Sequence, residues 1–291
     1  MLNLQTTIFS KHLHWLNWEN LAERSKNIGF TGIDLTVRPG GHVLPERVEE
    51  DLPKVHEICK KAGIEITMLC TNIQSSDEDA AAKILNTASQ LGIKQYRMGW
   101  YFYQKERSLC ENLEDIKCRL KDLAAMNEHY KIKGSYQNHD GDWFGSSVWD
   151  LGSLLKEIDS PWLGCQYDIL NATIEAANSW VWGLEYLSKY IHSIDIKDAL
   201  WVIENGKQKL KYVPLGQGMI NLKTFLHYIH KLRINVPYSF HFEYELGGAE
   251  KGLDYLRTPA QNVISSIKND FSLFKEMIEK NNHFEDLVIA S

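Results

Sequence analysis

The sequence alternates short β-rich runs with longer amphipathic stretches, and this alternation repeats eight times along 291 residues. Such a pattern builds a parallel sheet whose strands are joined by crossover helices. Eight pairs match a closed (β/α)8 barrel, because a doubly wound sheet would usually need fewer strands or a second domain. We therefore expect residues 1–291 to form a single TIM barrel domain. The predicted strands are Leu4–Phe9, Gly32–Thr36, Glu65–Cys70, Gln95–Gly99, Lys133–Gln137, Leu163–Asp168, His192–Ile196 and Tyr238–Glu243.

The predicted helices have recognisable ends. Asn17 suits the N-cap of the first helix, because its side chain can accept a hydrogen bond from the first turn. Gly29, Gly63 and Gly92 each follow an apolar-periodic stretch, where a left-handed residue commonly ends a helix. The helices are expected to begin near Asn17, Glu46, Asp77, Asn112, Ser147, Asn178, Asn221 and Pro259.

Residues 201–212 interrupt the alternation. Two short β-rich runs flank Asn205 and Gly206, a dipeptide that favours the tight turn of a β-hairpin. The sequence therefore predicts a small hairpin inserted after strand seven, on the rim formed by the C-terminal strand ends.

Composition and charge narrow the class of protein. With 44% hydrophobic residues, the chain has enough apolar material for a full core. Its 32 Lys and Arg against 38 Asp and Glu give a net charge of −6 without a basic cluster, which disfavours nucleic-acid binding. No apolar run approaches the roughly 18 residues of a membrane span, and no secretion signal is recognisable.

The cysteines are odd in number and scattered, without CxxC spacing. This fits reduced thiols packed in a core better than disulfides or a zinc site. We therefore expect a cytoplasmic protein with a small-molecule substrate and neither nucleic-acid nor membrane partners; a homo-oligomer stays open. The five cysteines are Cys59, Cys70, Cys110, Cys118 and Cys165.

Acceptor side chains end four successive predicted strands. In a TIM barrel, the active site is built at the C-terminal strand ends and the loops that follow. Converging oxygen donors at this position suit a divalent cation such as Mn²⁺, Mg²⁺ or Zn²⁺. The four candidate metal ligands are Gln137, Asp168, Asp195 and Glu243.

The alternative is a polar network without metal, in which the same side chains pair with Arg38, Arg97 and Lys197. Arg38 and His42 belong to a Pro-Gly-Gly turn after strand two, where backbone N–H groups and an arginine can bind a carboxylate or phosphate. A salt-bridged loop arginine is the other reading of Arg38. The Gly-Gln-Gly run at 216–218 is more typical of a tight turn than of a phosphate site.

Other residues near the rim have ordinary structural explanations. Tryptophan and tyrosine can stack on sugar faces, but each taken singly is more typical of packing. The histidines His12 and His14 are more typical of surface or satisfied core positions than of a site. The rim aromatics are Trp100, Tyr101, Trp143, Trp180 and Trp201.

Several strand-end motifs occur together along the chain: Asp-Leu-Thr-Val-Arg-Pro-Gly-Gly-His-Val at 34–43, Tyr-Gln-Asn-His at 136–139, Gln-Tyr-Asp-Ile at 166–169, Ile-Lys-Asp at 196–198, Pro-Leu-Gly-Gln-Gly at 214–218 and His-Phe-Glu-Tyr-Glu-Leu-Gly-Gly-Ala-Glu at 241–250. In combination, they resemble the sugar phosphate isomerase/epimerase group of the xylose isomerase-like TIM barrels. The resemblance covers essentially the whole chain. It implies a barrel that acts on a sugar or sugar derivative, often with a divalent metal on strands five to eight.

The resemblance places the family's metal-binding Asp at Asp168 and its last Glu at Glu243. Two positions depart from the family's pattern. Gln137 stands where ketose epimerases have a Glu that is both metal ligand and acid/base, and Asp195 stands where the strand-seven motif has a His.

A third departure lies in the pattern Asp-x-x-His-x-x-x-Glu, which here ends in Asn171 and Glu175; Asn171 replaces a substrate-contacting His. A neutral Gln137 cannot take a proton, so Glu243 remains the one carboxylate base. Its expected partners are His139, His241 or Lys197. The substrate-binding residues are expected to be Arg38, His42, Arg97, Trp100, Asn171, Glu175 and His241.

Three functions remain open. The leading hypothesis is a sugar or sugar-phosphate isomerase or epimerase in which a divalent metal assists proton transfer next to a carbonyl. A lyase or hydratase acting on an oxidised sugar is the alternative that Gln137 favours, and a catalytically silent sugar-binding barrel is the third. Endonuclease IV relatives share the barrel and hold three zinc ions. In this chain, Gln137 and Asp195 reduce the number of ligands for such a site, and the negative net charge disfavours DNA binding.

Overall fold

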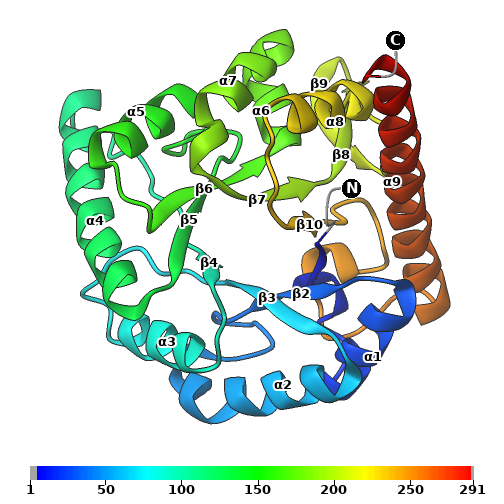
Figure 1. The fold of residues 1–291 in the computed structure, drawn as a ribbon, viewed down its shortest axis with the longest axis horizontal. Helices are drawn as coiled ribbons and strands as arrows, with labels where there is room; N and C mark the ends of the chain where they lie inside the picture. Colours follow the sequence, from blue (N-terminus) through cyan, green and yellow to red (C-terminus); the bar gives the residue numbers. More distant parts are fainter. Residues whose placement is uncertain (1–4, 290–291) are drawn as a thin grey trace.

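The computed structural model describes the backbone of residues 5–289 and the side chains of residues 5–280. Eight parallel strands close into a barrel in the order β1-β10-β7-β6-β5-β4-β3-β2, with the helices outside them (Figure 1). The predicted TIM barrel is confirmed. Its strands are β1 (Thr6–Phe9), β2 (Gly32–Thr36), β3 (Glu65–Cys70), β4 (Gln95–Arg97), β5 (Lys133–Gln137), β6 (Leu163–Asp168), β7 (Ile191–Ile196) and β10 (Tyr238–Phe240).

The strand ends differ from prediction mainly at the mouth of the barrel. β4 ends at Arg97, and β10 ends at Phe240, three residues before Glu243. Two residues beyond the end of β10, the backbone N–H of Phe242 donates to the side chain of His12, at Nε2, over 3.0 Å. Leu4, the predicted start of the first strand, lies outside the described residues.

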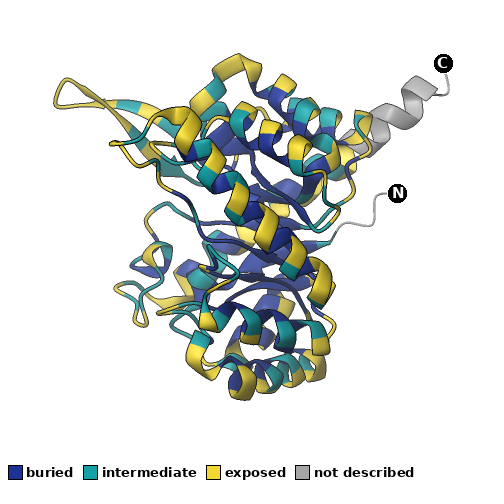
Figure 2. Cartoon of the chain, turned by 90° about the vertical axis from the view of Figure 1, so that its left-hand side faces the viewer, coloured by how far each residue is buried: buried dark blue, intermediate teal, exposed yellow. Residues whose placement is uncertain are grey.

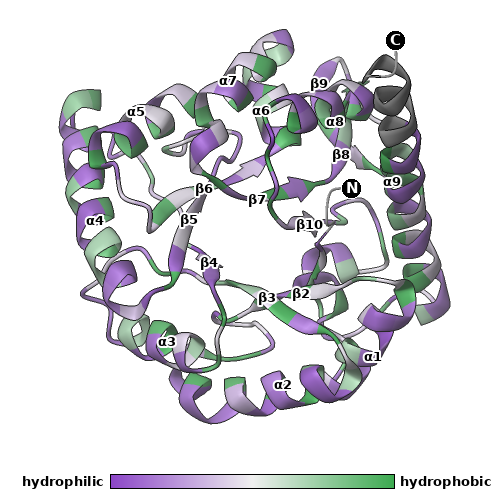
Figure 3. Cartoon of the chain, in the orientation of Figure 1, coloured by the Kyte–Doolittle hydropathy of each residue, from purple (hydrophilic) through white to green (hydrophobic). Residues whose placement is uncertain are grey.

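The helices pack around the barrel and alternate hydrophilic and hydrophobic residues along their length (Figure 3). Buried residues concentrate on the strands and on the inward helix faces (Figure 2). The α-helices are α1 (Trp18–Ile28), α2 (Val48–Ala62), α3 (Asp79–Gln90), α4 (Leu109–Tyr130), α5 (Val148–Ile158), α6 (Ile169–Ala176), α7 (Trp180–Leu187), α8 (Leu222–Lys231) and α9 (Ala260–Ile289). Within the described range, no helix is long and apolar enough to span a bilayer.

The helix ends show which local signals the sequence carries. Asn17 caps α1 as predicted, since its Oδ1 accepts from the backbone N–H of Asn20 at 3.0 Å. The predicted start of α4 near Asn112 is wrong by one turn. Ser108 and Glu111 form a capping box that starts the helix at Leu109, whereas Asn112 is buried inside its first turn.

The predicted hairpin is present directly after β7, as β8 (Asp198–Glu204) paired with β9 (Lys207–Val213). Asn205 and Gly206 form its turn with φ values of 54° and 74°, the left-handed pair that a type I′ turn requires. The hairpin begins at the mouth, and its second strand returns Tyr212 to the mouth.

Candidate active site

The C-terminal ends of the strands surround a cavity of about 170 Å³, which we call the mouth cavity. Its walls come from the ends of six barrel strands and from the hairpin. Eight of the predicted site residues are brought together there: Arg38, Arg97, Trp100, Gln137, His139, Lys197, His241 and Glu243. Lys11, Phe9 and Tyr212 complete the lining.

Asp195 is the centre of a buried hydrogen-bond network at the end of β7. Its two carboxylate oxygens accept from Nε2 of Gln137 and from Nε2 of Gln166, both at 2.6 Å. Nε2 of His241 lies 3.3 Å from Oδ1 of Asp195. Burial opposes ionisation of this carboxyl group, but His241 and the hydrogen bonds outweigh burial and lower its pKa. Asp195 is therefore a structural anion that fixes Gln137 in the cavity wall, next to His241.

Asp168 and Lys197 form a buried ion pair at the ends of β6 and β7. Nζ of Lys197 lies 2.9 Å from Oδ2 of Asp168, while Oδ1 accepts from the backbone N–H of Asn171 at 3.0 Å and caps α6. Burial alone would lower the pKa of Lys197, but the Asp168 carboxylate raises it above its ordinary value. Lys197 is thus an ammonium and cannot act as a base in this state.

Glu243 follows β10 and is paired with Lys11, whose Nζ donates to Oε2 at 3.0 Å. Burial opposes its ionisation, but His12, Lys11 and Lys197 outweigh burial and lower the pKa of Glu243 to about 2. Glu243 is therefore a carboxylate at neutral pH, able to accept a proton when its pairing with Lys11 is loosened.

Arg97, at the end of β4, is 3% exposed. Its Nη1 donates to Oε1 of Gln137 at 2.9 Å, and its guanidinium lies 4.5 Å from the ring centre of Trp100. This cation–π contact fixes the plane of the guanidinium. Its Nε and Nη2 have no hydrogen-bond partner among the described residues.

His139 follows β5 and packs edge-on against Trp100, with ring centres 4.8 Å apart. Its Nδ1 lies 2.9 Å from the backbone oxygen of Asp140. A carbonyl oxygen can only accept, so in the neutral form of the ring Nδ1 carries the proton and Nε2 bears the lone pair. His139 thus offers a base at Nε2 in the mouth cavity.

Three predicted substrate-binding residues lie outside the mouth-cavity lining. The ring of His42 packs edge-on against that of His14, with centres 5.0 Å apart, its Nδ1 lies 3.3 Å from Oγ1 of Thr36, and burial lowers its pKa to about 4. The side chain of Asn171 donates to the backbone oxygen of Asn138. Glu175 is exposed and accepts from the backbone N–H of Gly141.

Two further motifs have structural roles. The glycines at 216 and 218 donate their backbone N–H groups to Oδ2 of Asp198 at 3.0 and 2.9 Å, so the turn already binds an anion of its own chain. His12 is fully buried, with Nδ1 near the backbone oxygen of Ala249 and Nε2 accepting from Phe242. Both outcomes match the structural alternatives that the sequence favoured.

Sequence reasoning missed three lining residues. Lys11 follows β1, and the strand-end rule that selected the other candidates would have found it. Phe9 ends β1 and stacks on the ring of His241, with centres 4.5 Å apart. Tyr212 comes from the hairpin, and its place depends on a register that the sequence alone does not specify.

The donor set at the mouth does not fit a divalent cation in this arrangement. The carboxylate of Asp168 is paired with Lys197 and that of Glu243 with Lys11. The amide oxygen of Gln137, its one metal-ligating atom, accepts from an arginine. Across the described side chains, no three or more His, Cys, Asp or Glu residues form a group able to hold a metal ion. A metal would have to displace three cationic side chains.

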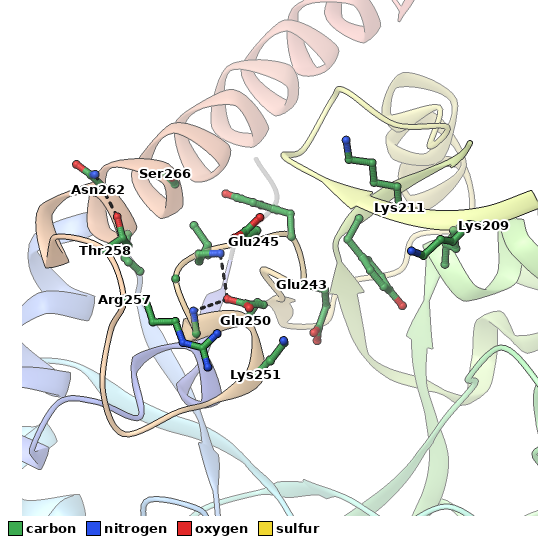
Figure 4. A pocket seen from close by; sticks show the side chains of 17 residues that line it. Lys209, Lys211, Glu243, Glu245, Glu250, Lys251, Arg257, Thr258, Asn262 and Ser266 are labelled. Carbon is green, nitrogen blue, oxygen red and sulfur yellow. Dashed lines mark hydrogen bonds between the residues drawn. The ribbon is translucent and has the colours of Figure 1, made fainter. Parts of the chain in front are cut away.

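A larger groove of about 890 Å³ adjoins the mouth cavity and shares Tyr212 and Glu243 with it. Figure 4 shows Glu243 between the hairpin that carries Lys209 and Lys211 and the loop that carries Glu250. Oε2 of Glu250 accepts from the backbone N–H groups of Leu246 and Gly248 and holds that loop. A ligand at Glu243 can extend outward along this groove.

The comparison with family models places the chain in a known family. A family model described as xylose isomerase-like TIM barrel matches residues 22–258, and the chain belongs to this family. No curated protein matches the chain.

Solved structures share the fold at low sequence identity. D-psicose 3-epimerase with D-tagatose from Clostridium cellulolyticum H10 superposes with a TM-score of 0.73 at 10% identity, covering 94% of this chain and 99% of that one. A xylose isomerase-like TIM barrel protein from Mycobacterium smegmatis in complex with magnesium gives 0.70 at 12%, covering 95% and 98%. The probable 3-DHS dehydratase AsbF from Bacillus anthracis gives 0.68 at 15%, covering 92% and 99%.

Proposed function

We propose that the protein moves a proton at a carbon next to the carbonyl group of a sugar or sugar derivative, as an isomerase or epimerase. One observation carries the proposal: a carboxylate, Glu243, a base, Nε2 of His139, and an ammonium, Lys197, line one small cavity. These groups supply the acid/base and oxyanion-stabilising functions that such a proton transfer requires. The likeness to a sugar epimerase supports the same class.

The positions of the two bases suit transfer between the faces of a substrate. Glu243 follows β10 and His139 follows β5, and β7 and β6 lie between these strands in the barrel order. The two side chains therefore approach the cavity from different sides. In this proposal, the Glu243 carboxylate removes the proton from the substrate carbon. Nε2 of His139 takes up a proton from solvent and delivers it to the second position or face, and Glu243 then releases its proton to solvent.

Lys197 stabilises the oxygen that becomes negative when the proton leaves. It remains an ammonium because Asp168 is beside it, and an N–H group aimed at a developing oxyanion stabilises the transition state more than the ground state. The positive charge of Lys197 takes the role that a divalent cation has in the metal-assisted alternative. No step of the proposed reaction requires a metal.

A lyase or dehydratase is the second candidate, and Gln137 favours it. Gln137 donates to Asp195 and accepts from Arg97, so it is held as a neutral amide and leaves Glu243 as the one carboxylate in the cavity wall. A single base with an acid near the leaving hydroxyl group is sufficient for β-elimination. The likeness to a probable dehydratase supports this candidate.

Product analysis separates the two reactions. The purified protein is incubated with a panel of pentoses, hexoses and their keto and acid derivatives, and products are identified by mass and by NMR. An isomerase or epimerase gives products of unchanged mass, and Glu243→Gln abolishes their formation. Products that have lost one water establish the lyase. Binding without any product, unchanged by Glu243→Gln, contradicts both enzymes and establishes the sugar-binding barrel.

A further inference from the structure

Arg97 has two buried donors without a hydrogen-bond partner in the wall of the mouth cavity. It is 3% exposed and lines the mouth cavity, yet Nε and Nη2 have no partner within the described part of the chain. A buried guanidinium without an anionic partner is costly to maintain. The two free donors lie on the same edge of the guanidinium, and this edge binds a carboxylate through two parallel hydrogen bonds.

The same chain shows this contact elsewhere. On α2, Nε of Arg47 donates to Oδ2 of Asp51 at 2.7 Å, and Nη2 donates to Oδ1 at 3.0 Å. Arg97 offers the same pair of atoms, while its Nη1 is occupied by Gln137. The contact of Arg97 with Trp100 holds this edge in a fixed plane. The mouth cavity therefore contains one half of a bidentate arginine–carboxylate pair.

The other charges of the mouth cavity point to the same ligand. Four cations and one carboxylate line it. Lys11 and Lys197 are paired with Glu243 and Asp168, but the guanidinium of Arg38 makes no ion pair with the described residues and lies 5.5 Å from the ring centre of Phe9. The two cations of the wall that have no directly paired carboxylate among the described residues are thus the two arginines.

We infer that the substrate carries a carboxylate group, which Arg97 binds side-on and Arg38 helps to neutralise. The inference rests on the proposed function for the sugar part of the ligand and adds that the substrate is a sugar acid. A planar carboxylate has two coplanar oxygens that match the free edge of Arg97, as Asp51 matches Arg47. A tetrahedral phosphate is the competing oxyanion, and a neutral sugar leaves both guanidinium groups uncompensated.

Calorimetry with matched pairs of acids and neutral sugars tests the inference without turnover. The probes are D-glucuronate with D-glucose, D-gluconate with D-glucitol, and D-glycerate with glycerol, together with D-glucose 6-phosphate. At least one acid is expected to bind ten-fold or more tightly than its neutral partner and more tightly than the phosphate. Equal affinity within every pair, or tighter binding of the phosphate, overturns the inference.

Substitutions of the arginines test which side chain causes the preference for acids. Arg97→Gln is expected to reduce the preference for acids at least ten-fold. Arg97→Lys keeps the charge but lacks the two-donor edge, and it is expected to cause most of the same reduction. Arg38→Gln, at a half-buried position, gives a second reading if the Arg97 variants do not fold, and its expected loss is smaller, about three-fold. Arg47→Gln is the control and leaves the preference unchanged. If Arg38→Gln and every folded Arg97 variant keep the full preference for acids, the inference is contradicted.

The outcome is separable from that of the proposed function. Turnover of a neutral sugar with no preference for acids overturns the carboxylate assignment and keeps the isomerase or epimerase. Selective binding of acids without any turnover keeps the assignment and overturns the enzyme.

Discussion

The Nζ atom of Lys197 lies 2.9 Å from Oδ2 of Asp168, and both side chains are buried at the mouth of the barrel. This pair explains two properties of the site. It keeps Lys197 charged inside the cavity wall, and it occupies the carboxylate that the family resemblance assigns to a metal. The positive charge that the proposed reaction uses is thus supplied by a residue of the chain.

Lys197→Met is expected to lower both stability and turnover. The substitution leaves the Asp168 carboxylate buried and unpaired, which costs about 3–5 kcal/mol in free energy of unfolding. It also removes the oxyanion-stabilising charge, which is expected to reduce kcat by about 10²–10³. Urea unfolding and steady-state kinetics measure the two effects.

The double variant Lys197→Met with Asp168→Asn separates pairing from catalysis. Removing both charges is expected to restore much of the stability but none of the turnover. Lys207→Met, at the exposed hairpin turn, serves as the control and leaves both quantities unchanged. Recovery of turnover in the double variant would contradict the role given to Lys197.

Asp34 makes stability depend on pH. It is buried on β2, where Ser239 donates to Oδ2 at 2.9 Å, and burial together with the Asp195 charge raises its pKa to about 6. The folded state then binds this proton more tightly than the unfolded state, so its contribution is fully present below pH 4 and is lost as pH rises through 6.

Asp34→Asn is therefore expected to raise the free energy of unfolding at pH 8 by up to about 3 kcal/mol and to change it little at pH 4. Unfolding in urea at several pH values measures the difference. Asp51→Asn is expected to lower the free energy of unfolding at neutral pH, the opposite effect. The reason is that Arg47 lowers the pKa of Asp51, so the stabilisation by its carboxylate is present at neutral pH. A difference for Asp34→Asn that is independent of pH would contradict the assignment.

In the proposed reaction, Lys11 is expected to set the acid limit of turnover through Glu243. Lys11→Met removes the ammonium 3.0 Å from Glu243, so the pKa of Glu243 is expected to rise from about 2 toward its ordinary value. The acid limb of the kcat/KM profile then moves to higher pH. Lys251 lines the larger groove next to the mouth cavity, and Lys251→Met serves as the comparison, which should leave the acid limb of the profile unchanged. An unshifted limb in Lys11→Met would show that Glu243 is not the group that titrates.

Turnover is expected to survive removal of divalent metal. The carboxylates of Asp168 and Glu243 are each paired with a lysine, so dialysis against a chelator should change kcat by less than two-fold. Elemental analysis before and after dialysis, with Mn²⁺, Mg²⁺ and Zn²⁺ added back, checks this. Stoichiometric metal that is lost in Asp168→Ala, together with turnover that requires it, would establish the metal-assisted alternative.

The barrel was predictable because its signals are local and repeated. Eight alternations, the Asn17 cap and the Asn205–Gly206 turn each specify an element through nearby residues, and the structure contains all of them. The start of α4 could also have been predicted, because Ser108 and Glu111 have the spacing of a capping box. The apolar pattern alone indicated a later start.

The strand-end rule found most of the mouth cavity but not its internal pairing. It places Asp168, Asp195 and Glu243 at one rim, whereas the side chain that each one contacts depends on side-chain directions across different strands. Lys11 is 232 residues from Glu243 in the sequence. His42 shows the converse, because it belongs to a loop at the correct end of the barrel and yet its ring packs against His14 and Thr36, outside the cavity lining.

Hydrogen exchange at the substrate carbon tests the central claim most directly. The protein is incubated in D₂O with the sugar acid that binds most tightly, and deuterium at the carbon next to the carbonyl is followed by NMR. We predict incorporation that falls at least 10²-fold in Glu243→Gln and persists in Glu245→Gln, an exposed neighbour on the same loop. Turnover without exchange of that proton, or exchange that is unchanged in Glu243→Gln, would contradict proton transfer by this site.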